Sequence, residues 1–214
     1  MPINKSPSLP FGISGLWDAY QITWKTLHGR LGSSAEPSMI SAGAEEPIGQ
    51  SARATTFKSW WDVELAASQY EASDPDRADK IYLDGIRQFP RSSELLGNYA
   101  LFLKNVRQDV DGAEALYKRA IEADPKHGNS LCNYALFLEI KRKDMKGAER
   151  YYKRALDANP TDAITLGNYA DFLETARKNY PEAKRYYELS LKQDPNNQRN
   201  KKNYERLLTK MKKP

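Results

Sequence analysis

The stretch LGNYALFLKNVRQDVDGAEALYKRAIEADP, residues 96–125, sets the architecture of the chain because it recurs twice further along. The later copies are LCNYALFLEIKRKDMKGAERYYKRALDANP at 131–160 and LGNYADFLETARKNYPEAKRYYELSLKQDP at 166–195. Each copy begins 35 residues after the previous one, and a period of this length is typical of repeat architectures. An Asn-Tyr pair marks the same step at 98–99, 133–134, 168–169 and 203–204.

Each copy contains two helical patterns separated by a polar break. In residues 91–125, apolar side chains recur every three or four residues from Leu96 to Leu103, and again from Ala113 to Ile121. Asp124-Pro125 ends the second pattern, because proline disfavours helical backbone in the residue before it. The sequence therefore predicts helix-turn-helix units at 91–125, 126–160 and 161–195. A single unit buries too little apolar surface to be stable, so neighbouring units must stack.

This pattern resembles the tetratricopeptide repeat (TPR), whose units have 34 residues. The matching positions in the first copy are Leu96, Tyr99, Ala100, Leu103, Ala113, Tyr117, Ala120 and Pro125, and nearly all recur in the next two copies. We expect the extra residue in the turn between the two helices, where an insertion disturbs packing least. The resemblance implies an all-α, right-handed α-solenoid of helix-turn-helix repeats.

Residues on either side extend the array. We expect 55–90 to form a degenerate first unit, because Ala78, Tyr82 and Pro90 fit the pattern of a second helix. Residues 196–214 restart a first helix and are predicted to form a basic capping helix and tail, which such arrays need. Before the array, 1–31 is predicted to hold one amphipathic helix, around Ser14–Leu31, and the small, polar segment 32–54 to be a flexible linker.

Composition narrows the class of protein. No stretch approaches 18 uninterrupted apolar residues, so we expect no membrane span. One cysteine, Cys132, and two histidines, His28 and His127, are too few for the usual zinc sites or for an internal disulfide. Nucleotide-binding, hydrolase and metalloprotease motifs are also missing. We therefore expect a cytoplasmic, non-enzymatic protein without metal or cofactor, with an organelle transit peptide left open.

The positive charge is concentrated at the end of the chain. The formal net charge is +5, and residues 197–214 hold seven cations against Glu205 alone. The seven are Arg199, Lys201, Lys202, Arg206, Lys210, Lys212 and Lys213. A solubilising end cap is the favoured interpretation. The alternative is binding to nucleic acid or another acidic surface, with an affinity that falls steeply with salt.

The resemblance also implies a concave groove lined by the first helices. Asn98, Asn133 and Asn168 resemble the asparagine of that groove in the family. An amide can donate to and accept from the backbone of an extended peptide, although pairing with neighbouring helices is an equally good interpretation. By alignment, further side chains are expected on the same surface: Leu101, Leu136 and Ile140, with Lys104, Glu139, Asp171 and Glu174.

These neighbours indicate the kind of partner. TPR proteins that bind the C-terminal carboxylates of chaperones carry basic residues beside the asparagine, where this chain has Gly97, Cys132 and Gly167. That ligand is therefore disfavoured. We expect a protein or peptide partner of basic or mixed apolar-basic character.

A second family gives an alternative function. Residues 169–174, YADFLE, followed by Ala183 and Tyr187, also resemble the half-a-TPR (HAT) repeats of RNA-processing assemblies. Glu139 and Glu174 lie near the acidic position of that family, whereas Lys104 departs from it.

Overall fold

The computed structural model describes residues 56–212 of the chain. The helix expected at Ser14–Leu31, the linker expected at 32–54 and Lys213 of the basic tail lie outside these residues. No helix among the described residues is both long and apolar enough to cross a lipid bilayer.

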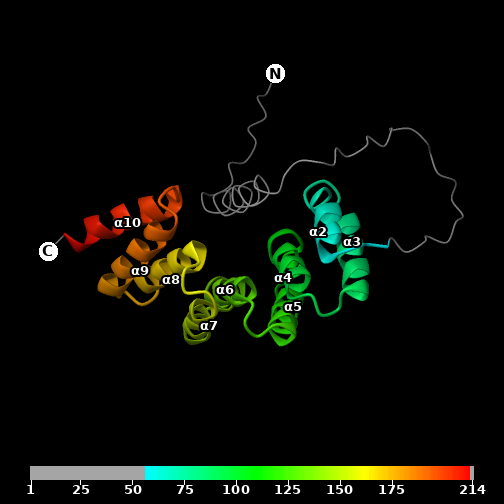
Figure 1. Cartoon of the computed structure of the whole chain (residues 1–214), viewed down its shortest axis with the longest axis horizontal. Helices are drawn as coiled ribbons and strands as arrows, with labels where there is room; N and C mark the ends of the chain where they lie inside the picture. Colours follow the sequence, from blue (N-terminus) through cyan, green and yellow to red (C-terminus); the bar gives the residue numbers. More distant parts are fainter. Residues whose placement is uncertain (1–55, 213–214) are drawn as a thin grey trace, which may run out of the picture. The chain divides into compact units, whose positions relative to one another are not determined.

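Nine α-helices and no strands occur between residues 56 and 212, and they follow one another as hairpins (Figure 1). Four hairpins are followed by a single helix, and we call the earlier helix of each hairpin its first helix. The helices are α2 (Trp60–Ser68), α3 (Pro75–Gln88), α4 (Ser93–Phe102), α5 (Val110–Ala123), α6 (Gly128–Phe137), α7 (Met145–Ala158), α8 (Ala163–Thr175), α9 (Tyr180–Gln193) and α10 (Gln198–Met211). Residues 60–211 thus form an all-α solenoid of stacked helical hairpins, as expected.

The first helix of two units ends in an unusual turn. α4 continues into the π-helical segment η1 (Leu103–Arg107), and α6 continues into η2 (Leu138–Arg142). A π-helical turn holds one residue more than an α-helical turn, so it can accommodate an extra residue at the end of a helix. Both segments lie between the two helices of their unit, where the extra residue is expected, while the third unit has the same length although α8 ends at Thr175 without a π-helical segment.

Side-chain caps define where the second helices begin. Asp109 accepts a hydrogen bond from the backbone N–H of Gly112 at 2.9 Å, and Asp144 accepts one from Gly147 at 2.9 Å. Asn179 caps α9 in the same way. These caps satisfy N–H groups that have no partner within the helix, so the polar break in the sequence also acts as a start signal.

The hairpins pack as two layers. Neighbouring first helices contact one another directly, in the pairs α2–α4, α4–α6, α6–α8 and α8–α10. The second helices α3, α5 and α7 pack against the first helix of their own unit and the first helix of the next one. Figure 1 shows the two layers, with α4, α6 and α8 in one and α5, α7 and α9 in the other. The surface formed by the first helices is therefore continuous from unit to unit.

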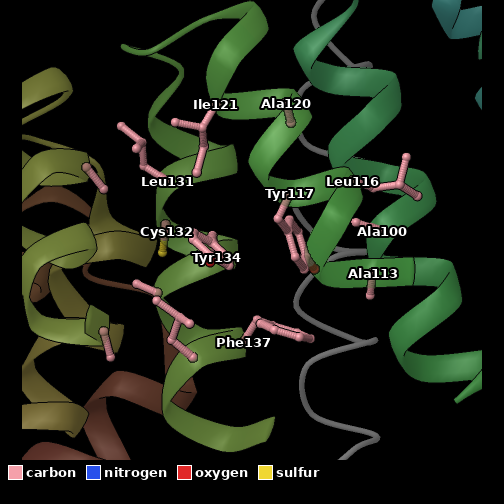
Figure 2. Packing of buried hydrophobic residues seen from close by; sticks show 14 of the residues in the cluster. Ala100, Ala113, Leu116, Tyr117, Ala120, Ile121, Leu131, Cys132, Tyr134 and Phe137 are labelled. Carbon is pink, nitrogen blue, oxygen red and sulfur yellow. The ribbon is translucent and has the colours of Figure 1, made fainter. Parts of the chain in front are cut away.

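Tyrosine pairs connect the units. Each second helix places a fully buried tyrosine against the Asn-Tyr tyrosine of the following first helix. The ring centroids lie 5.1 Å apart for Tyr82–Tyr99, 5.9 Å for Tyr117–Tyr134, 5.8 Å for Tyr152–Tyr169 and 6.4 Å for Tyr187–Tyr204. Figure 2 shows Tyr117, Tyr134 and Phe137 in the interior between α5 and α6. The recurring tyrosines of the sequence thus meet in ring-to-ring pairs at each successive interface.

The last helix, α10, packs closely on α8 at a glycine, and a hydrogen-bonded asparagine of α10 fills the space beside it. Gly167 of α8 lies against the side chain of Asn200 of α10, and a Cβ at this position would lie 2.3 Å from Asn200 Nδ2. That amide is itself fixed, because it donates to Ser190 Oγ at 2.6 Å. The glycine therefore allows α10 to pack closely on α8.

We predict that Gly167→Ala lowers the free energy of unfolding by about 1–3 kcal/mol, because α10 must move away from α8. Gly97→Ala is the matched control at the equivalent position two repeats earlier, where the nearest atom to an added Cβ is the hydroxyl of Ser130 at 3.1 Å. The control should change stability by less than about 1 kcal/mol, since alanine also favours the helix. Urea unfolding followed by circular dichroism measures both, and equal effects would contradict this account of α10.

Candidate protein-binding face

Six of the residues expected to bind a partner lie on α4, α6 and η2 and remain at least partly exposed. We call them the first-helix face: Asn98, Leu101, Asn133, Leu136, Glu139 and Ile140. On each helix they are separated by steps that bring side chains to one side. Ile140 is 45% exposed, and Leu101 and Leu136 are half-buried. The face therefore combines an apolar strip with amides and a carboxylate.

The three asparagines differ in their contacts. The side-chain amides of Asn98 and Asn133 are half-buried, and neither forms a hydrogen bond with another described residue. Asn168 is 6% exposed, donates to Cys132 Sγ at 3.5 Å and accepts from Arg199 Nη1 at 3.0 Å. Asn168 therefore pairs within the chain, whereas the side-chain amides of Asn98 and Asn133 have no partner among residues 56–212.

The acidic residues also divide into two groups. Glu139 accepts a hydrogen bond from Tyr152 Oη at 3.0 Å and contacts no described cation within ion-pair distance. Burial raises the pKa of Glu139, and the hydrogen bond from Tyr152 offsets only part of that effect. Asp171 pairs with Arg206 of α10 at 3.1 Å, so its charge is already balanced inside the chain.

Glu174 is the most completely enclosed of the expected groove acids. It is 1% exposed and forms ion pairs with Arg206 at 2.9 Å and Lys210 at 2.7 Å. Burial raises the pKa of Glu174, but the hydrogen bonds from Arg206 and Lys210 outweigh burial and leave the pKa below its ordinary value. The carboxylate anchors α10 and is not available to a partner in this arrangement.

The basic tail is divided in the same way. Arg199, Arg206 and Lys210 point into the chain and bind Asn168, Asp171 and Glu174. Lys201, Lys202 and Lys212 are exposed and have no ion-pair partner among residues 56–212. Half of the described tail cations therefore hold the terminal helix in place.

Sequence reasoning missed these ion pairs, although the sequence contained a signal for them. Arg206 lies 35 residues after Asp171, which is one full repeat. Residues one period apart on neighbouring first helices can meet, so opposite charges at that spacing indicate an ion pair. The signal could have been found by comparing charges across the period instead of along each helix.

Lys104 occupies the position of Glu139 and Glu174 but has very different surroundings. It is 8% exposed and forms no ion pair or hydrogen bond through its side chain with any described residue. Burial lowers the pKa of Lys104 to about 8, and repulsion from Lys141 adds to the effect. A buried cation without a partner is unfavourable, so this position costs the array stability when Lys104 is protonated.

Two shallow hollows lie away from the first-helix face. One is at the junction of α3 and η1 and includes Pro75, Tyr99 and Arg107. Another is on α7, between Lys146 and Arg154, and includes Arg177 of the neighbouring unit. Neither contains a residue of the first-helix face.

The repeat region matches the sequence profile of the tetratricopeptide repeat over residues 63–128, 106–163 and 138–198. The three overlapping matches span more than half of the chain, which therefore belongs to the tetratricopeptide repeat family. Repeats of this family are typically scaffolds for protein–protein interaction and not enzymes, and this chain is a non-enzymatic scaffold of that class.

Solved structures with the same fold include PilF of Pseudomonas aeruginosa, which is 24% identical to this chain with a TM-score of 0.55. The aligned region covers 64% of this chain and 62% of the PilF chain. PilW, described as a widely conserved type IV pilus biogenesis factor, is 22% identical with a TM-score of 0.53. The aligned region covers 63% of this chain and 61% of the PilW chain. The first TPR domain of Spaghetti (RPAP3), bound to the HSP90 peptide SRMEEVD, is 20% identical with a TM-score of 0.52. The aligned region covers 57% of this chain and 95% of that domain.

These structures show the fold alone, because each is less than 25% identical to the chain. The chain spans about three-fifths of the PilF and PilW chains that it matches. No curated protein matches the chain significantly.

We predict that the stability deficit caused by Lys104 disappears at high pH. In the unfolded chain a lysine has a pKa near 10.4. Between pH 8 and about 10, the unfolded chain therefore binds a proton that the folded chain has released, so folded-state stability rises with pH relative to a variant without this amine. We expect Lys104→Met to be more stable than the natural chain at pH 7 and to lose about 1–3 kcal/mol of that advantage by pH 10.

Urea unfolding at pH 7, 8, 9 and 10 measures this difference. Lys146→Met, at an exposed position of α7, is the control and should follow the natural chain at every pH. A constant difference between Lys104→Met and the natural chain would show that the amine of Lys104 is not held in an unfavourable environment.

Proposed function

We propose that the first-helix face binds an extended peptide or a helix of a partner protein, and that it lines the concave groove of the array. The observation that carries this proposal is the pair of unpaired amides, Asn98 and Asn133, beside the partly exposed side chains of Leu101, Leu136 and Ile140. Half-buried amides without partners have hydrogen-bonding capacity left for a ligand backbone. The apolar strip supplies the hydrophobic contact that such an interaction needs.

The partner in this proposal has mixed character. Its apolar side chains pack on Leu136 and Ile140, and a basic side chain approaches Glu139, the acid of the face that forms no ion pair with a described cation. The position before each asparagine is Gly97, Cys132 or Gly167 and supplies no cation, so the C-terminal carboxylate of a chaperone is not the proposed ligand. The RPAP3 domain binds an HSP90 peptide, and that ligand is not carried over to this chain.

The other functions considered from the sequence have less support. A role in an RNA-processing assembly rests on the HAT resemblance alone, and nothing further favours it. Nucleic-acid binding through the tail has less support because three of its seven cations already contact groups inside the chain. These are Arg199, Arg206 and Lys210. Placement in the cytoplasm is part of the proposal and rests on the composition of the chain.

We predict that Leu136→Asp and Ile140→Asp each weaken partner binding at least tenfold, because a carboxylate in the apolar strip must be desolvated when the partner docks. Leu83→Asp is the matched control, since Leu83 is 43% exposed on the second-helix layer. Quantitative affinity capture with full-length variants, followed by titration of the purified partner, measures the effect. Full binding by folded Ile140→Asp and Leu136→Asp chains would disprove the proposed face.

A further prediction separates the tail from the face. We expect the triple variant Lys201→Gln, Lys202→Gln, Lys212→Gln to remain as stable as the natural chain, because these lysines are exposed and unpaired among the described residues. Partner binding should also be unchanged. Thermal unfolding and partner titration at low and high salt measure both, and loss of a salt-sensitive interaction in this variant would favour the tail as the binding element.

A further inference from the structure

A buried tyrosine donates to a carboxylate in three of the four hairpins. Tyr82 Oη donates to Glu71 at 2.7 Å and lies 3.0 Å from Glu64. Tyr152 donates to Glu139 at 3.0 Å, and Tyr187 lies within 3.4 Å of Glu174. In each of these three units the acid comes from the first-helix side of the same hairpin. The tyrosine hydroxyl and the carboxylate therefore form a recurring internal pair.

The second hairpin lacks this pair. Tyr117 Oη is fully buried and is the only such side-chain polar atom without a hydrogen-bond partner between residues 56 and 212. The residue 13 positions before Tyr117 is Lys104, whereas the residue 13 positions before Tyr152 and Tyr187 is a glutamate. Burial raises the pKa of Tyr117, so the hydroxyl keeps its proton as a donor.

Lys104 adds an unpaired cation at the same place. It is the second residue of η1, as Glu139 is the second residue of η2, so their backbone positions correspond. No described carboxylate pairs with Lys104, and the charged neighbour that acts on it is Lys141. Lys141 is exposed and donates to Gln108 at 3.5 Å, which places it beside the end of η1. Two amines without a carboxylate partner thus belong to the region of η1, and the hydroxyl of the same hairpin lacks the acid that the next two units supply.

We infer that the second hairpin binds a carboxylate from outside, namely the side chain of an aspartate or glutamate in the partner segment. Lys104 and Lys141 pair with this carboxylate, and the Tyr117 hydroxyl donates to it once the Lys104 side chain, which has no described partner, turns outward. The inference rests on the proposed function, because the same partner segment lies on the first-helix face. The partner then carries an acidic side chain toward η1 and a basic one toward Glu139.

The recognition is distinct from the asparagine positions of the face. It uses the end of the first helix, at η1, and it is specific to one unit, because Glu139 and Glu174 supply the acid internally in the next two units. The charge order along the array, amine at 104 and carboxylate at 139, gives the bound segment a single favoured direction. A segment with the reverse order of charges would place like charges together.

The test is selection of a phage-displayed library of random 12-residue peptides on the full-length chain. The peptides are displayed without a free C-terminus, so only side-chain carboxylates are available. We expect the natural chain to enrich Asp or Glu at one fixed position beside apolar residues. Selected peptides are then synthesised with acetylated and amidated ends, in Glu and Gln versions, and the Glu version should bind at least tenfold more tightly.

Three variants identify the site. Lys104→Met should lose at least tenfold in affinity for the Glu peptide, and Tyr117→Phe should lose about threefold to tenfold while folding as stably as the natural chain. Lys104→Glu should raise the thermal midpoint, because it supplies the acid for Tyr117, and should abolish Glu-peptide binding. Lys146→Met, on α7, is the control and should bind normally. A structural role alone for Lys104 would leave peptide affinity unchanged.

The outcomes separate this inference from the proposed function. Peptides that depend on Ile140 and Leu136 but bind Lys104→Met and the natural chain equally would overturn the carboxylate site and leave the face intact. Peptides that are insensitive to Ile140→Asp, or a selection that yields no binder, would overturn both. Glu45 and Glu46 belong to the segment 32–54, outside the described residues. Tighter peptide binding by a Glu45→Gln, Glu46→Gln chain would show that these acids of the chain itself occupy the site, and would overturn the assignment to a partner.

Discussion

The contact between a second-helix tyrosine and the Asn-Tyr tyrosine of the next unit is the constraint on which the array depends. It places an aromatic ring from each hairpin in the interface with its successor, and it recurs four times between α3 and α10. Since a single hairpin buries too little apolar surface, these interfaces convert four weak units into one cooperative core. A constant spacing between units is consistent with this contact, because each unit must present its tyrosine at the same position in the interface.

The same tyrosines bring a polar atom into the core, and the chain must provide for it. A buried hydroxyl without a partner costs about 1–3 kcal/mol, so an acid on the first-helix side is retained in three hairpins. The exception at Tyr117 and Lys104 is therefore informative, because two unfavourable features occur together in a region that is otherwise well satisfied. Natural sequences tend to depart from local consistency where function requires it.

Much of the fold could be predicted from the sequence, because a strict period reports on packing directly. The positions of Tyr99, Tyr134 and Tyr169 follow from the repeat alone, as do the stops at Pro125 and Pro160. The candidate site was less accessible, because its chemistry depends on contacts between units. Asn168 and Glu174 look like their counterparts Asn133 and Glu139 in the sequence, yet α10 covers both. The π-helical ends of α4 and α6 could not be predicted either, because the sequence pattern does not distinguish a π-helical turn from an α-helical one.

The attachment of α10 bears on how such a chain can change in length. Arg206 and Lys210 of α10 neutralise Asp171 and Glu174 of α8. Asn200 of α10 also packs against Gly167, so α10 is matched to α8 and to no other first helix among the described residues. Duplication of a 35-residue module upstream of α8 would preserve every one of these matches. A module inserted between α9 and α10 would separate them and would leave a buried acid at the new junction. Growth of the array by tandem duplication is therefore tolerated in its interior and penalised at its C-terminal seam.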